Sequence, residues 1–191
     1  MEFKFKQFSI YHQDNVFKFG TDAALLATWV DMSKSKNVLE IGTGTGVITL
    51  MMAQRNPNGS YLGIDISKTA IELASKNLHK FPIDAEIKFK HSAIQDFSFE
   101  GKFDLIVSNP PFFNSDKAET SREVARNQSK LTFEELLRDT SALLKDDGRF
   151  CVIIPSDSEE QFTSLATQNN LHKNKICKVY GNPNVACKRV L

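Results

Sequence analysis

The residues around position 40 constrain the fold strongly, because an apolar strand runs there into a glycine-rich turn. The strand, residues 38–41, is followed by Gly42, Gly44 and Gly46 and then by apolar residues at helical spacing over 47–53. This order predicts a strand, a loop and the start of a helix. In an open α/β sheet, nucleoside cofactors bind at such a turn, outside the carboxyl end of the strand.

The spacing of the glycines argues against a dinucleotide site. In the pattern G-x-G-x-x-G the third glycine comes one residue later, at the place that Val47 occupies here. Glu40 precedes the loop, and its carboxylate would be an unfavourable neighbour for a pyrophosphate but would suit a cofactor with a cationic centre. The next expected strand ends in Asp65, about 20 residues past the loop, where an acid accepts from the two hydroxyls of a ribose.

Strands and helices alternate along the chain. Strands are expected at 37–41, 60–65, 85–90, 103–108 and 149–154, and helices at about 21–31, 46–55, 67–79, 132–145 and 157–169. Ser67 is the expected N-cap of one helix, and Asp147 with Gly148 is expected to end another. Because strands separated by helices imply right-handed crossovers, we predict an α/β fold with a doubly wound, mostly parallel sheet.

An antiparallel carboxyl-terminal hairpin is expected after this sheet. Its strands would be residues 177–182 and 185–191, on either side of an Asn-Pro-Asn turn. We expect one domain over residues 1–191, with residues 1–31 flanking the cofactor and the substrate. The chain is expected to continue past Leu191, because it stops within an apparent strand.

A proline-bounded motif follows the expected strand at 103–108. Asn109, Pro110, Pro111 and Phe112 come directly after it, and the prolines end the strand because they lack a backbone N–H. There the Asn109 amide oxygen and the Pro110 carbonyl could accept both protons of a planar amino group, while Phe112 stacks on the attached ring. A simple turn is the alternative from these residues alone, since Asn and Pro are ordinary turn formers.

These motifs occur in the order found in a known family. Glu40 with the three glycines, then Asp65, then the motif at 109–112 make the chain resemble the S-adenosylmethionine-dependent amino-methyltransferases. Segments 8–13, 17–29 and 122–131 resemble the bacterial subfamily that methylates N6 of the adenosine next to the anticodon, position 37, in a valine tRNA. That subfamily tends to have His where this chain has Asn127. The resemblance implies a Rossmann-like fold and the same reaction.

The resemblance also implies roles for particular residues. Asp65 would hold the ribose of S-adenosylmethionine, the loop backbone would lie against its methionine part, and Glu40 would face its cationic groups. Asn109, Pro110, Pro111 and Phe112 would form the catalytic motif. The other expected cofactor contacts are Gly20, Thr21 and Asp22 at the amino-acid end and Ser92 and Ala93 beside the adenine. For Ser92 and Ala93 a plain strand-end turn is an open alternative.

Positive charge is concentrated near the end of the chain. The net charge is only +1, which argues against a protein that coats nucleic acid by charge alone. No acidic residue follows Glu160, and the basic residues beyond it are Lys173, Lys175, Lys178, Lys188 and Arg189. We expect these residues to bind RNA phosphates, together with Lys18 and Arg126. A solvated strand edge kept soluble by lysines is the alternative.

Composition bears on location and cofactors. No apolar stretch reaches the roughly 20 residues that span a bilayer, and the amino terminus lacks a secretory pattern, so a cytoplasmic protein is expected. Cys151, Cys177 and Cys187 form no C-x-x-C pair and the histidines are scattered, so no metal is expected. A monomer or weak dimer is expected.

Rival functions remain open. The same motif could act on a guanine N2 of ribosomal RNA or on a protein glutamine side chain, although such enzymes usually carry an additional domain. A nicotinamide-dependent oxidoreductase is opposed by the glycine spacing and by Glu40. A module that binds cofactor or RNA without catalysis is opposed by the intact motif at 109–112.

Overall fold

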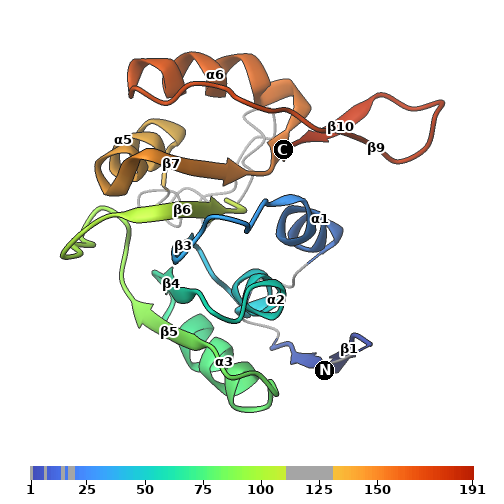
Figure 1. Cartoon of the computed structure of the whole chain (residues 1–191). Coiled ribbons are helices and arrows are strands. Elements are labelled where there is room, and N and C mark those ends of the chain that lie inside the picture. Colours follow the sequence, from blue (N-terminus) through green and yellow to red (C-terminus); the bar gives the residue numbers. More distant parts are fainter. Residues whose placement is uncertain (1, 7, 14–15, 17–19, 111–130) are drawn as a thin grey trace, which may run out of the picture.

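The computed structural model describes residues 2–6, 8–13, 16, 20–110 and 131–191, and its centre is a parallel five-stranded sheet (Figure 1). The strand order is β5-β4-β3-β6-β7, so the chain moves outward from β3 in one direction and then returns to the other side of it. The predicted doubly wound sheet is confirmed. Its strands are β3 (Asn37–Ile41), β4 (Ser60–Asp65), β5 (Glu86–His91), β6 (Phe103–Ser108) and β7 (Leu144–Val152).

Helices cover both faces of this sheet, with α1 and α2 on one side and α5 on the other (Figure 1). Val38 of β3 belongs to one apolar cluster with Leu26 of α1 and Leu50 of α2. Its neighbour Leu39 faces the opposite side and clusters with Leu136 of α5. The central strand is therefore buried on both faces, as in other covered parallel sheets. The helices are α1 (Thr21–Trp29), α2 (Val47–Arg55), α3 (Lys68–His79), α5 (Phe133–Leu143) and α6 (Glu159–Gln168).

Side-chain caps fix the start of two helices. The predicted N-cap of α3 is confirmed, because the Ala70 N–H donates to Oγ of Ser67 at 3.3 Å. At α5 the Glu135 N–H donates to Oγ1 of Thr132, and the Glu135 carboxylate accepts from the Thr132 N–H at 2.8 Å. Such caps satisfy backbone donors that the helix itself leaves open, and each stabilises its helix by about 1 kcal/mol.

The prediction that Asp147 and Gly148 end a helix is wrong. α5 has already ended, and Leu144 pairs with Phe103 in the sheet. Two residues further along β6 the partner is Arg149, so the intervening residues form a bulge within β7. A Cβ at Gly148 would lie 2.8 Å from Cγ of Leu144, which explains the glycine. The Asp-Gly pair therefore marks a bulge in a strand that begins earlier than expected.

An amino-terminal hairpin, which was not predicted from the sequence, packs beside α3. Its strands β1 (Glu2–Lys4) and β2 (Ser9–Tyr11) are antiparallel. Buried Asn77 of α3 accepts a hydrogen bond from the Tyr11 N–H at 2.8 Å and donates to the Tyr11 carbonyl at 3.3 Å. The Asn77 nitrogen also donates to the Thr45 carbonyl at 2.8 Å. One side chain thus joins the hairpin, α3 and the glycine turn.

The predicted carboxyl-terminal hairpin is confirmed, and it lies in a separate antiparallel sheet. The strand order is β8-β10-β9, with β8 (Ile154–Pro155), β9 (Lys178–Tyr180) and β10 (Cys187–Val190). Figure 1 shows β9 and β10 extending away from the central sheet. Ser156, in the short helix η1 (Ser156–Ser158), donates from Oγ to the Cys187 carbonyl at 2.6 Å and so anchors the base of the hairpin.

Candidate cofactor and acceptor site

A cavity of about 320 Å³ opens at the carboxyl ends of β3, β4 and β6. It lies where the strand order reverses, which is where open α/β sheets bind their ligands. The lining is formed by Ala23, Leu131 and the segments 40–45, 47–48, 64–66, 92–95 and 108–110. Motifs far apart in the sequence therefore meet at one cavity, because parallel strands place their carboxyl ends at the same edge of the sheet.

The backbone of the glycine loop requires its glycines. Gly42, Gly44 and Gly46 have φ angles of +74°, +54° and +80°, in the left-handed region that L side chains rarely adopt. A Cβ at Gly46 would also lie 2.9 Å from the ring of Phe89. The Gly42 N–H donates to the Ile64 carbonyl at 2.9 Å, which joins the loop to β4. The loop is thus a tight bend of bare backbone that a ligand can approach closely.

Asp65 lines the cavity and braces this loop. Its Oδ2 accepts from the Gly44 N–H at 2.8 Å, and its Oδ1 accepts from the Ser67 N–H at 2.8 Å. Each carboxylate oxygen has a further lone pair. Asp65 can therefore accept hydrogen bonds from two adjacent hydroxyls without releasing either backbone donor.

Glu40 lines the cavity too, but one of its oxygens is used within the protein. Its Oε2 accepts from Oγ1 of Thr43 at 2.7 Å, from the Thr49 N–H at 3.0 Å and from the Thr49 hydroxyl. Burial raises the pKa of Glu40 from its usual 4.5 to about 7, although these hydrogen bonds oppose the rise. Glu40 therefore holds the loop against α2, a role that the sequence did not reveal.

Apolar walls complete the end of the cavity near β4 and β5. Ile66 is 60% exposed and Ile94 is buried, and both line the cavity. Neither was predicted, although Ile66 directly follows the acid and Ile94 follows the predicted pair Ser92 and Ala93. That pair lines the cavity and also forms a strand-end turn, in which the Ser92 N–H donates to the Asp65 carbonyl at 3.0 Å.

The first half of the proline motif reaches the same cavity. Asn109 and Pro110 line it at the end of β6. The preceding residue, buried Ser108, donates from Oγ to the Ile41 carbonyl at 3.0 Å and so fixes the end of β6 against β3. Four predicted site residues lie outside the described residues, namely Pro111, Phe112, Lys18 and Arg126.

The predicted residues at the start of α1 lie next to the cavity. Gly20 is the N-cap, Thr21 and Asp22 begin the helix, and Ala23 lines the cavity. Oδ2 of Asp22 lies 2.8 Å from Nε of Arg189. This ion pair joins a residue expected at the cofactor to one expected at the RNA.

The predicted phosphate ligands differ in their surroundings. Lys173 pairs with Glu159 at 3.3 Å, so its charge is partly neutralised. Lys175, Lys178 and Lys188 are exposed, and no carboxylate within the described part of the chain pairs with them. These three lysines are therefore the better placed to bind a polyanion.

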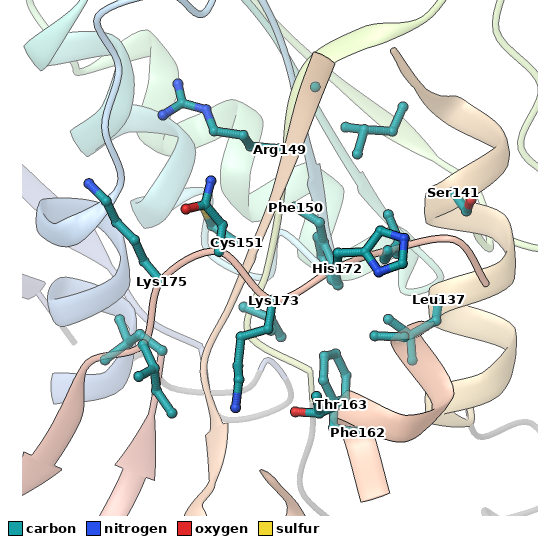
Figure 2. Close-up of a pocket in the computed structure, with 18 of the residues that line it drawn as sticks. Leu137, Ser141, Arg149, Phe150, Cys151, Phe162, Thr163, His172, Lys173 and Lys175 are labelled. Carbon is teal, nitrogen blue, oxygen red and sulfur yellow. The ribbon is translucent and has the colours of Figure 1, made fainter. Parts of the chain in front are cut away.

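A larger groove, about 650 Å³ in volume, runs along β7 (Figure 2). Figure 2 shows Arg149, Lys173 and Cys151 around it. Arg149 pairs with Asp31 at 3.0 Å, and burial raises the pKa of the Cys151 thiol to about 11, so that the thiol stays protonated. The groove shares no lining residue with the glycine loop. The larger groove is therefore separate from the cavity at the glycine loop.

The described residues do not meet the requirements of a metal site, a membrane-spanning helix or a disulfide. Within the described ranges, no three His, Cys, Asp or Glu side chains lie together as a metal site requires. No helix there has the length and apolar character needed to cross a membrane. Cys151, Cys177 and Cys187 are free thiols.

Comparisons with known proteins agree with this geometry. Residues 7–180 match the model of the methyltransferase small domain family. The chain is 41% identical over 189 residues to the tRNA1(Val) (adenine(37)-N6)-methyltransferase of Flavobacteriaceae bacterium (strain 3519-10), and the match covers 99% of this chain and 81% of that protein.

Solved structures share the fold at low identity. A methyltransferase from Pyrococcus furiosus superposes with a TM-score of 0.68 at 16% identity, over 95% of this chain and 85% of that one. An O-methyltransferase of Brevibacillus brevis, solved with S-adenosyl-L-homocysteine, gives a TM-score of 0.60 at 18% identity over 83% and 55% of the two chains.

Proposed function

Because the chain belongs to the methyltransferase small domain family, we propose that it transfers a methyl group from S-adenosylmethionine to the N6 amino group of an adenosine in tRNA. The relative named above supports a finer assignment, position 37 of a valine tRNA. One observation carries the proposal: the glycine loop and Asp65 share a cavity with Asn109 and Pro110. A tRNA substrate also supports the proposal that the enzyme acts in the cytoplasm.

The residues around the cavity fit this cofactor. S-adenosylmethionine supplies a methyl group on a cationic sulfur. The remaining lone pairs of Asp65 suit the ribose hydroxyls, and Ile66 and Ile94 suit the faces of a flat adenine. The loop backbone, with Gly20, Thr21 and Asp22 beside it, would hold the methionine part. The buried carboxyl of Glu40 beneath the loop adds a group that favours a cation over a pyrophosphate.

The acceptor end of the cavity suits a planar amine. Oδ1 of Asn109 and the carbonyl of Pro110 would accept the two protons of the adenosine amino group, and this would hold its lone pair toward the methyl donor. The same two oxygens would spread the positive charge that develops on the nitrogen during transfer. The methylated ammonium is acidic enough to lose its proton to water, so the reaction needs no dedicated base. Phe112 would replace the stacking that the adenosine loses when it leaves the anticodon loop.

Two variants separate cofactor binding from chemistry. Asp65→Ala should weaken binding of S-adenosylhomocysteine by about 1.5–3 kcal/mol, the value of a hydrogen bond to a charged group. Asn109→Ala should keep that affinity and lose methyl transfer, because Asn109 is assigned only to the acceptor. The exposed Asp84→Ala is the matched control. The readouts are calorimetry and mass spectrometry of nucleosides from tRNA treated with each variant. Normal turnover by Asn109→Ala, or methylation of protein but not tRNA by the wild type, would contradict the proposal.

A further inference from the structure

The hairpin of β9 and β10 presents an aromatic ring to solvent. Tyr180, at the end of β9, is 52% exposed, and no ring or cation contact engages it among the described residues. Lys178 on the same strand and Lys188 on its partner are also exposed. A single exposed ring is common on protein surfaces, so its surroundings must decide whether it binds anything.

The hairpin stands on the same edge of the molecule as the acceptor end of the cavity. β10 pairs with β8, which begins just after Ile153, and the Ile153 N–H donates to the carbonyl of Ser108 at 3.4 Å. Ser108 directly precedes Asn109. On the other side, Arg189 is bonded to Asp22, the neighbour of the cavity-lining Ala23. Two separate contacts therefore connect the base of the hairpin to the site.

The charge of the β9–β10 hairpin indicates what kind of partner it would bind. No acidic residue follows Glu160 in the sequence, so the hairpin carries only positive charge. A hairpin that exposes one aromatic ring and two lysines matches single-stranded nucleic acid, in which each base offers a face for stacking and each phosphate a negative charge. A second copy of this chain would bring the same positive hairpin and is the less favourable partner.

We propose that this hairpin is an arm that holds the RNA substrate, with Tyr180 stacking on an unpaired base and Lys178 and Lys188 binding phosphates beside it. The inference rests on the proposed tRNA substrate. An adenosine that enters the cavity must leave its stack, and a ring that holds a neighbouring base keeps the opened loop in place. Arg189 then acts differently from the lysines, because it fixes the arm to α1 through Asp22.

The test uses paired variants of the full chain. Tyr180→Ala should raise the dissociation constant for the tRNA substrate about tenfold, whereas Tyr180→Phe keeps the ring and should bind as the wild type does. The affinity for S-adenosylhomocysteine should stay unchanged in both. Lys178→Gln with Lys188→Gln should flatten the salt dependence of tRNA binding. Lys34→Gln with Lys102→Gln is the matched charge control, because both lysines are exposed and come just before the amino ends of β3 and β6, at the opposite edge of the central sheet from the cavity.

The outcomes separate this inference from the proposed function. If the wild type methylates tRNA and Tyr180→Ala binds it normally, the arm is refuted and the function stands. If Tyr180→Phe is as weak as Tyr180→Ala, stacking is refuted. If Tyr180→Ala instead changes the molar mass in light scattering and leaves RNA affinity alone, the hairpin is a contact between copies of this chain. An enzyme that methylates no tRNA at all overturns the proposed function itself.

Discussion

Among single residues, Glu40 is buried beside the cavity and accepts hydrogen bonds from Thr43 of the glycine loop and Thr49 of α2. Its position before the glycines indicated a site for a cationic ligand. Its bonds to Thr43 and Thr49 could not be foreseen, because they depend on how the first turns of α2 fold back over β3. The buried carboxyl therefore belongs to the support of the loop as well as to the cavity.

This burial makes stability depend on pH. The pKa of Glu40 is raised from 4.5 to about 7 in the folded protein, so the folded state binds the proton more tightly than the unfolded chain does. The resulting stabilisation is complete below pH 4.5 and is lost as pH rises through about 7. Relative to Glu40→Gln, the free energy of unfolding of the wild type should fall by up to about 3 kcal/mol across this range. Urea unfolding of both proteins at about pH 5 and about pH 8 measures it. If the free energies of unfolding of the wild type and of Glu40→Gln changed equally between these pH values, the raised pKa of Glu40 would be contradicted.

At the scale of elements, the central strands were predictable and the irregular ones were not. Strands β3, β4 and β6 match their expected bounds, because each is an apolar run bounded by polar or turn residues. The start of β7 was missed, since its bulge is created by pairing with β6, which local pattern does not contain. The strands β1 and β2 were missed for a similar reason. Three-residue strands carry too little periodicity, and a contact with α3 holds them.

The contact between α1 and β10 should couple two elements. Asp22 and Arg189 are both about one-third exposed or less, so their pair should be worth no more than about 1 kcal/mol. In a double-mutant cycle of unfolding free energies, Asp22→Ala and Arg189→Ala should be less damaging together than the sum of the single effects. Arg189→Ala should also weaken S-adenosylhomocysteine binding a few-fold, because α1 borders the cavity. Lys188→Ala is the control, and strictly additive effects would rule out the coupling.

For the whole molecule, the distribution of charge matters more than the net charge of +1. Lys175 and Lys173 are close together on one segment, but among the residues that the structure describes only Lys173 has a carboxylate within reach, that of Glu159 at 3.3 Å. Lys175→Gln should therefore reduce the log-log salt slope of tRNA binding by about 0.7–0.9, and Lys173→Gln should reduce it by less. Titrations of both variants with tRNA at several salt concentrations measure the two slopes. Equal effects would show that the Glu159 pair opens when RNA binds.

The site as a whole followed from topology. The family resemblance assigned Gly42, Asp65 and Asn109 to one reaction, and they line one cavity because parallel strands bring their carboxyl ends to one edge of the sheet. Its apolar walls were not expected. Ile66 and Ile94 come from turns after β4 and β5, and in the sequence nothing distinguishes them from ordinary core residues.

Asn77 connects the amino-terminal hairpin to the glycine turn, so local opening of the hairpin should depend on whether the cavity is occupied. Its side chain holds the Tyr11 amide on one side and the Thr45 carbonyl of the glycine turn on the other. When a ligand occupies the cavity and steadies the turn, the Tyr11 amide should exchange its hydrogen with deuterium more slowly, although β2 does not line the cavity. Asn77→Ala should abolish that slowing. Hydrogen–deuterium exchange of the Tyr11 amide in β2 would thus report whether a ligand occupies the cavity, at a distance from the cavity itself.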